Sequence, residues 1–211
     1  MQCPICANLG KAVFQGKIMQ KYDIQYYQCD KCGFLYTEKP YWIEEAYEDS
    51  ITNVDTGIMQ RTIDNVLVTN ALVHSFYNKK ANFLDYGGGY GIFTRMMRDL
   101  GYNWLWYDKY SENLVARGFE YETSNCIELI SAFELFEHFE KPLEELKRLF
   151  SISKSILFST LIYDENLKYK SFDDWWYYVP ETGQHISFYS KYTLEYLAKK
   201  YGVYYYMINN G

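Results

Sequence analysis

The chain has 211 residues, of which 48% are hydrophobic and 23% are charged, proportions that suit one α/β domain with a small appendage. Its formal net charge of −6 argues against a nucleic-acid partner, because phosphate contacts need clustered Lys and Arg side chains. The sequence contains no run of about 18 apolar residues, so neither a membrane-spanning helix nor a membrane partner is predicted.

Residues 1–40 contain two C-x-x-C pairs separated by 22 residues, formed by Cys3, Cys6, Cys29 and Cys32. Two residues between thiolates let both sulfurs reach one ion, and two such pairs supply the four-sulfur set of a structural Zn²⁺. Gly33, directly after the second pair, suits the tight turn that such a knuckle needs. Four cysteines leave no open coordination position, so residues 1–40 are predicted to form a zinc-ribbon-like module with a structural role.

The alternatives to zinc are free thiols or two disulfides. The start of the sequence has neither a basic segment nor an apolar segment of the kind that signal peptides have, which predicts a cytoplasmic protein. In that reducing compartment, paired cysteines indicate a metal before disulfides. Cys126 lies in an apolar stretch and is expected to be a small buried residue.

Residues 41–80 are predicted to form a helical connector. Its apolar side chains are spaced for one buried face, which consists of Ile63, Val66, Leu67, Ala71, Leu72 and Val73. From residue 81 onward, strand-like and helix-like segments alternate. The expected strands are 82–86, 104–107, 126–133, 155–162 and 203–208, and the expected helices are 92–100, 142–150 and 192–200. Such alternation indicates crossover connections and a mainly parallel sheet with helices on both faces, which binds ligands at the carboxyl ends of its strands.

A glycine-rich segment, Asp85-Tyr86-Gly87-Gly88-Gly89-Tyr90-Gly91, follows one of these strands and opens a helix. Glycines there let the backbone turn tightly and approach a ligand without a Cβ in the way. The dinucleotide spacing G-x-G-x-x-G is not met, and no G-K-[ST] follows, which excludes a P-loop. Asp108 ends the next expected strand, 17 residues after Gly91.

This D-x-G-x-G-x-G segment, followed by Asp108, resembles motif I of the class I S-adenosylmethionine-dependent methyltransferases. The resemblance implies that the glycine loop contacts the methionine and ribose portions of the cofactor. It also implies that Asp108 accepts hydrogen bonds from the ribose hydroxyls, while Asp85 orients the loop and holds the cofactor's ammonium group. The implied cofactor-binding residues of this segment are Asp85, Gly87, Gly89, Gly91 and Asp108.

Two later segments extend the resemblance. Residues 133–142 look like the family segment EVLEHxxxP beside the cofactor, which implies that Phe133 and Glu134 bind it. Residues 183–194 resemble the family's HxSFFS…TL stretch. With the cysteine pairs ahead of them, these segments are similar to methyltransferases of sugar, glycan and natural-product pathways. The implied fold is a Rossmann-like methyltransferase sheet in a cofactor-binding domain of residues 81–211.

The catalytic residues are expected among His185, His138 and Glu137. One interpretation makes His185 a general base, with His138 beside it, because a hydroxyl or carbon acid needs help to lose its proton. A second places a divalent cation at Glu134, Glu137, His138 and His185, a pattern similar to that of metal-dependent O-methyltransferases of small RNA and quinone pathways. A third treats Glu137 and His138 as a structural pair at a helix start. The aromatic run 175–180 ahead of His185 is expected either to cover the acceptor site or to pack in the core.

The predicted function is therefore an S-adenosylmethionine-dependent methyltransferase with a small-molecule acceptor, a sugar or a natural-product or glycan intermediate. A metal-assisted O-methyltransferase acting on RNA or on a quinone-like acceptor is the first alternative. The second is an inactive methyltransferase-like binding module. The acidic net charge counts against RNA, and the intact glycine loop with Asp108 counts against an inactive module.

Overall fold

The computed structural model describes residues 1–48, 55–164 and 170–208. It divides into two compact units: Met1–Ala46, Glu137–Leu143 and Thr160–Gly211 form the first, and Tyr47–Phe136 with Glu144–Ser159 form the second. The last quarter of the chain, from Thr160, is assigned to the cofactor domain by the sequence, but its contacts group it with the cysteine-containing segment.

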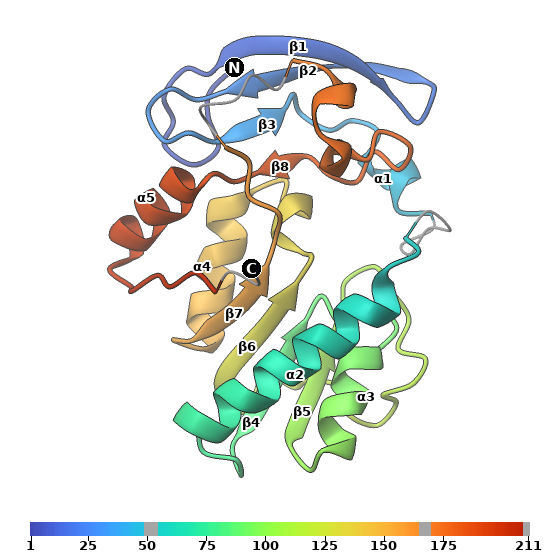
Figure 1. Ribbon diagram of the computed structural model, residues 1–211, viewed down its shortest axis with the longest axis vertical. Coiled ribbons are helices and arrows are strands. Elements are labelled where there is room, and N and C mark those ends of the chain that lie inside the picture. The colour runs from blue at the N-terminus through green and yellow to red at the C-terminus, as the bar shows by residue number, and fades with distance from the viewer. Residues whose placement is uncertain (49–54, 165–169, 209–211) are drawn as a thin grey trace. The chain divides into compact units, whose positions relative to one another are not determined.

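The first unit is built on an antiparallel sheet in the order β1-β2-β3-β8 (Figure 1). Its strands are β1 (Lys11–Ile18), β2 (Tyr22–Gln28), β3 (Leu35–Thr37) and β8 (Ser187–Phe188). The hairpin of β1 and β2 places alternate side chains on a core that is largely aromatic. Phe14 stacks on Tyr26 with ring centroids 4.4 Å apart, and such a pair adds about 1 kcal/mol beyond its buried area.

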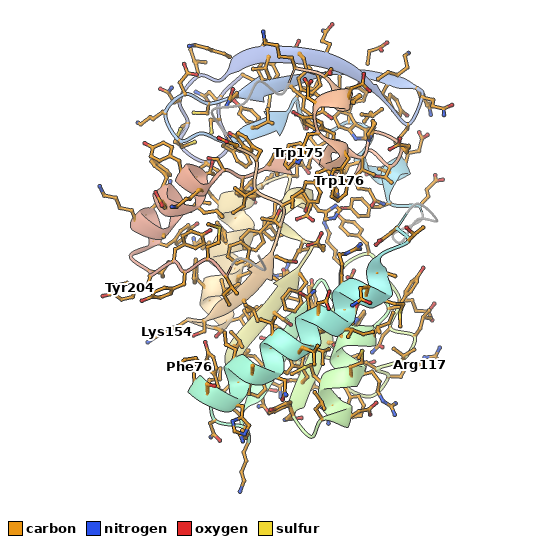
Figure 2. All side chains as sticks on the ribbon, in the orientation of Figure 1. Phe76, Arg117, Lys154, Trp175, Trp176 and Tyr204 are labelled. Atoms are coloured by element: carbon orange, nitrogen blue, oxygen red, sulfur yellow. The ribbon has the colours of Figure 1, made fainter. Side chains whose placement is uncertain are left out.

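The helical parts of the first unit are short. They are α1 (Ile43–Ala46), two 3-10 turns, η2 (Phe172–Asp174) and η3 (Trp176–Tyr178), and α5 (Lys191–Tyr201). A third 3-10 turn, η1 (Phe136–His138), has Phe136 in the second unit and its other two residues in the first. Ser190 begins α5 with its side chain accepting a hydrogen bond from the backbone N–H of Thr193 at 3.1 Å. Tyr177 and Tyr178 of η3 are buried in the aromatic core, whereas Trp176, labelled in Figure 2, is 72% exposed. The aromatic run thus divides between core packing and the surface.

The second unit contains a parallel sheet in the order β5-β4-β6-β7, and every strand pair in it is parallel. The strands are β4 (Asn82–Tyr86), β5 (Asn103–Tyr107), β6 (Ile127–Phe133) and β7 (Ile156–Ser159). Three helices flank it: α2 (Ile58–Phe76), α3 (Ile92–Asp99) and α4 (Pro142–Ile152), whose residues from Glu144 onward belong to this unit. In Figure 1, α2 crosses in front of the sheet and α4 lies behind it. The predicted fold class, a Rossmann-like parallel sheet with flanking helices, is confirmed.

The core of this sheet explains its stability. Phe83 of β4 and Trp104 of β5 are fully buried and stacked, with centroids 4.7 Å apart. Val66 and Val73 of α2 and Met97 of α3 cover them. A sheet that helices cover on its faces needs nearly continuous apolar strands, and the segments Asn82–Tyr86 and Asn103–Tyr107 have that composition.

Three expectations about single segments are wrong. Residues 203–208 form no strand in the structure, and Tyr204 and Tyr206 are 90% and 83% exposed. An aromatic segment such as this forms a strand only where the edge of a sheet is available to pair with it. Ile63, Leu67 and Ala71 of α2 are exposed, since an apolar helix offers more than one face and the sheet selects the one with Val66 and Val73. Cys126 lies just ahead of β6 and is exposed.

Among the described helices, none combines the length and the hydropathy needed to cross a membrane.

Candidate functional site

The predicted cofactor residues lie at the carboxyl ends of β4 and β5, which are neighbours in the parallel sheet. Gly87, Gly89 and Gly91 follow β4, and each has a left-handed backbone with φ of 79°, 52° and 86°. Side chains rarely adopt this conformation, so the loop requires glycine at these three positions. Gly87 donates its N–H to the carbonyl oxygen of Tyr107 at 2.8 Å, which ties the loop to the end of β5.

Asp108 holds the loop from the other side. Its carboxylate accepts the N–H of Gly89 at 2.9 Å, and the N–H groups of Tyr110 and Ser111 at 2.8 Å each. Charge-assisted bonds of this kind are about twice as strong as neutral ones. The structure therefore brings Asp108 and the glycine loop together, as the sequence predicts. The carboxylate lies beside the loop and also fixes its conformation through the bond to Gly89.

Asp85 is 3% exposed and lies at the end of a buried hydrogen-bond chain. It accepts the hydroxyl of Thr94 at 2.8 Å and the hydroxyl of Ser131 at 3.1 Å, and Ser131 in turn accepts the indole N–H of Trp104 at 3.2 Å. Burial raises the pKa of the Asp85 carboxyl from its ordinary value of 3.8 to about 7, although the two hydroxyl bonds favour the charged form. This carboxyl therefore titrates close to neutral pH.

Asp85→Asn is expected to flatten the dependence of stability on pH. Because the folded-state pKa is raised, the folded protein binds a proton between about pH 4 and about pH 7 that the unfolded chain does not. The free energy of unfolding should therefore fall as pH rises through this window, by up to about 4 kcal/mol. Urea unfolding at several pH values should show this fall in the wild type and a smaller one in the variant. Parallel curves of unfolding free energy against pH for the two proteins would contradict the raised pKa of Asp85.

Phe133 and Glu134 lie at the carboxyl end of β6. Phe133 is half-buried and packs edge-on against Phe93 of α3, with centroids 5.0 Å apart. Glu134 has a left-handed φ of 48°, unusual for a residue with a side chain. Its carboxylate accepts the Ser159 hydroxyl at 2.6 Å, and its N–H donates to the same hydroxyl at 3.0 Å. Strained residues of this kind cluster at functional sites, so Glu134 stays a candidate for cofactor binding, and Phe133 stays one by its place at the same strand end.

Glu137, His138 and His185 meet in the first unit, with one possible ligand atom of each within 4.8 Å of the others. Glu137 is fully buried, and its Oε1 accepts the Tyr177 hydroxyl at 2.5 Å. The two imidazole rings lie 4.9 Å apart and nearly perpendicular. The sequence predicts this cluster of three. Glu134, the fourth residue of the predicted cation site, belongs to the second unit and is bonded there to Ser159.

Backbone carbonyls orient both histidines. The Nδ1 atom of His185 lies 2.7 Å from the carbonyl oxygen of Tyr177, and that of His138 lies 3.2 Å from the carbonyl oxygen of Gln184. A carbonyl oxygen only accepts, so both Nδ1 atoms carry hydrogen. In the neutral ring, Nε2 then has the lone pair that takes a proton or binds a metal.

The four cysteines of the first unit also meet. Sγ of Cys3 lies 3.5 Å from that of Cys32, and Sγ of Cys6 lies 3.4 Å from that of Cys29. A tetrahedral zinc with four thiolates needs sulfurs about 3.8 Å apart, so this set fits the ion. The bond from Cys32 lowers the pKa of the Cys3 thiol to about 5.

The two knuckles share one backbone shape. In each, the residue after the second cysteine donates its N–H to the carbonyl of the first, Ala7 to Cys3 at 2.9 Å and Gly33 to Cys29 at 2.8 Å. Both residues are left-handed, with φ of 58° and 71°. Gly33 meets the prediction of a tight turn, whereas Ala7 adopts the same conformation without glycine's freedom.

The family model described as "Methyltransferase domain" matches residues 59–206, which run from α2 through α5. The chain belongs to this methyltransferase family. The matched region contains the glycine loop, Asp108 and the Glu137, His138 and His185 cluster, and it begins after the four cysteines. A search of curated proteins finds no match to the chain.

The sequence did not predict several hydrogen-bond partners of the candidate site residues. Thr94 and Ser131 hold Asp85, Tyr177 holds Glu137, and the Trp106 indole N–H donates to the carbonyl of Gly89 at 3.0 Å. Only Tyr177 had a signal in the sequence, as part of the aromatic run ahead of His185. Thr94 lies on the helix that the loop opens and Trp106 on the strand that Asp108 ends, but no local pattern marks these residues or Ser131 as hydrogen-bond partners of the site.

Proposed function

We propose that the protein uses S-adenosylmethionine to methylate a small-molecule acceptor, a sugar or a natural-product or glycan intermediate. The observation that carries this proposal is the glycine loop bonded to Asp108 at the carboxyl ends of β4 and β5, in a methyltransferase-family chain. A sulfonium cofactor has no phosphate, and the loop residues 85–91 include no cationic side chain. Asp108 would accept the ribose hydroxyls, and Phe133 and Glu134 would contact the cofactor beside it.

His185 would be the general base. Methyl transfer is an in-line displacement: the acceptor oxygen or carbon forms a bond to the methyl carbon while the carbon–sulfur bond breaks and its electron pair stays on sulfur. The acceptor's proton goes to Nε2 of His185, which the Tyr177 carbonyl keeps unprotonated in the neutral ring. S-adenosylhomocysteine is the other product. His138, oriented in the same way, would support the protonated ring or take its place.

An acceptor with a ring fits the surroundings of His185. Trp176 is 72% exposed, and its ring lies 5.5 Å from that of Tyr177, which in turn contacts His185 at 4.6 Å. An exposed aromatic ring that contacts the base through one intervening ring suits stacking of a sugar or an aromatic ring. The net charge of −6 supports a small molecule over RNA.

Zinc on the four cysteines would have a structural role. The set has no open position for a substrate, and three of its members are buried. Metal binding at such a site contributes directly to folding, because the unfolded chain has no preformed site. The segment of residues 1–40, which has only the strands β1, β2 and β3 of its own, would gain stability from this ion.

Calorimetric titration with S-adenosylmethionine and S-adenosylhomocysteine tests the proposal. We expect both to bind the wild type, and Asp108→Ala to weaken binding by about tenfold or more, since the N–H groups of Gly89, Tyr110 and Ser111 and the ribose hydroxyls would all lose their acceptor. Asp64→Ala, an exposed carboxylate on α2, is the matched control and should bind like the wild type. Absence of binding by a folded wild-type protein would favour an inactive binding module.

A metal-assisted O-methyltransferase is the second candidate, and the approach of Glu137, His138 and His185 within 4.8 Å favours it. Two imidazoles and a carboxylate suit a divalent transition metal and leave positions open for acceptor oxygens. Titration of zinc-loaded protein with Mn²⁺ decides between the candidates. Binding that Glu137→Gln removes would support the metal, and absence of binding would leave His185 as the base.

A further inference from the structure

We propose that Ser131 and Thr94 are positioning residues of the cofactor site: they hold the Asp85 carboxyl in a protonated and in a charged state, so that Asp85 releases a proton when the ammonium group of the cofactor binds beside it. The inference rests on the proposed function and deepens it. The resemblance to methyltransferases implies that Asp85 holds this ammonium group, but it assigns no role to the two hydroxyls or to a proton.

The Ser131 hydroxyl has more acceptors within reach than it has hydrogens. Its Oγ lies 3.1 Å from Oδ1 of Asp85 and 3.3 Å from the carbonyl oxygen of Leu84. It also accepts the indole N–H of Trp104 at 3.2 Å. A hydroxyl has one hydrogen and two lone pairs, so Ser131 donates either to Asp85 or to Leu84 at any one time.

The two contacts of Ser131 match the two protonation states of Asp85. When Asp85 is charged, the Ser131 hydroxyl donates to its Oδ1. When Asp85 is protonated at Oδ1, the carboxyl hydrogen is donated to Oγ of Ser131, which turns its own hydrogen to the Leu84 carbonyl. The Thr94 hydroxyl, 2.8 Å from Oδ2, donates in both states. The buried carboxyl therefore keeps its hydrogen bonds whether or not it carries a proton.

The charged form of Asp85 lacks a cationic partner within the described part of the chain. Asp108, the nearby charge, is negative and opposes ionisation. The charged side chains on the elements around Asp85 have other partners: Arg98 binds Asn103 and the Trp104 carbonyl, Arg95 binds Asp99, Arg61 binds Asp55, Asp64 binds Gln60, Glu128 binds the Asn78 N–H, and Glu134 binds Ser159. Burial, with Asp108 adding to it, raises the pKa of Asp85 to about 7, so both states are populated at neutral pH.

Gly88 brings the loop backbone directly against this carboxyl. A Cβ at Gly88 would lie 2.8 Å from Oδ2 of Asp85 and 2.6 Å from Cδ1 of Trp106, so any side chain there would cover the acid. An ammonium group that binds at this point supplies the positive charge that Asp85 lacks, and a nearby opposite charge favours the ionised carboxyl. The carboxyl proton leaves to the solvent, and no bond of the cofactor forms or breaks.

Infrared difference spectroscopy of the zinc-loaded free protein tests the two protonation states. We expect a carbonyl band of a protonated carboxyl that disappears as the pH rises through about 7. Asp85→Asn should lack this band, and Asp64→Asn, which changes an exposed carboxylate, should keep it. Thr94→Val and Ser131→Ala each remove a donor to the charged form, so the midpoint should rise by about one pH unit or more.

Calorimetry in two buffers of different ionisation enthalpy counts the protons released on binding. S-adenosylhomocysteine has the same ammonium group, and the wild type should release about half a proton per molecule bound at pH 7 and about 0.9 at pH 6. Asp85→Asn should release none. Thr94→Val should release about 0.9 at pH 7, because more of its Asp85 starts protonated. The control ligand 5′-methylthioadenosine, which lacks the amino-acid group, should bind without proton release.

Three results would overturn the inference: binding of S-adenosylhomocysteine without proton release, equal release by Asp85→Asn, or equal release with 5′-methylthioadenosine. An unchanged midpoint in both hydroxyl variants would remove Ser131 and Thr94 from the arrangement. Should Ser131→Ala fold poorly, Thr94→Val provides the same test, because valine keeps the shape of threonine. A folded wild type that binds no S-adenosylhomocysteine would defeat the proposed function and this linkage together, whereas binding without release defeats the linkage alone.

Discussion

Cys32→Ser should release the zinc and severely destabilise the first unit. The Cys32 side chain is fully buried, and its Sγ lies 3.5 Å from that of Cys3. Serine is a poor zinc ligand, so the tetrahedral set would lose one member. Structural zinc sites contribute about 10 kcal/mol or more to folding, so even a partial loss is comparable to the whole stability of an ordinary domain.

Metal content by elemental analysis, followed by thermal unfolding, measures this effect. Wild-type protein should carry one zinc per chain, and prolonged exposure to a strong chelator should lower its melting temperature as the variant does. Cys126→Ser is the matched control, because Cys126 is exposed and lies in the other unit. A Cys32→Ser protein with full zinc content and an unchanged melting temperature would refute the structural role of the site.

Gly91→Ala is expected to abolish cofactor binding and to lower the stability of the second unit by about 3 kcal/mol or more. Gly91 begins α3 with φ of 86°, where a side chain is strained. A Cβ there would lie 2.9 Å from the Cβ of Ala116 and from Oδ1 of Asn113, and 3.2 Å from the Ala116 backbone nitrogen. The backbone atom has no flexible end that can move aside, so the loop itself must shift.

Gly101→Ala separates the effect of backbone strain from the effect of the steric clash expected in Gly91→Ala. Gly101 has φ of 91°, nearly the same strain, yet a Cβ there would meet nothing within 4 Å. This control should lose about 1 kcal/mol of stability and bind S-adenosylhomocysteine like the wild type. Calorimetry and urea unfolding of both variants measure the difference. Equal losses would show that backbone strain alone, and not the fit of the loop, makes Gly91 necessary.

Some features of the molecule follow from local spacing. The two C-x-x-C pairs bring four sulfurs together because each pair already shares a turn, and one hairpin connects the pairs. The glycine loop could be placed after β4 because a strand, a turn and a helix follow one another within a few residues. Parallel pairing then brings Asp108 to the same edge, and its bond to Gly89 follows from that adjacency.

Other features depended on contacts between distant residues. Residues 203–208 have a strand-like composition, but composition does not reveal whether a sheet edge will accept a strand. The shift in the Asp85 pKa arises from burial beneath α3 and β6, which no local pattern states. Likewise, Glu134 and Glu137 are only three positions apart in the chain but group with different units, which no local pattern predicts.

The sequence by itself therefore determined the fold class, the four-sulfur cluster and the glycine loop with Asp108, because each depends on short spacings or on the regular adjacency of parallel strands. Only the tertiary structure decided which side chains surround the acid and the bases. Tyr177 lies 40 positions from Glu137 in the chain, and the bond between them forms because aromatic packing in the first unit buries both residues at one place. Burial and orientation are properties of that packing, and they set the protonation and the direction of the groups proposed to act on the acceptor.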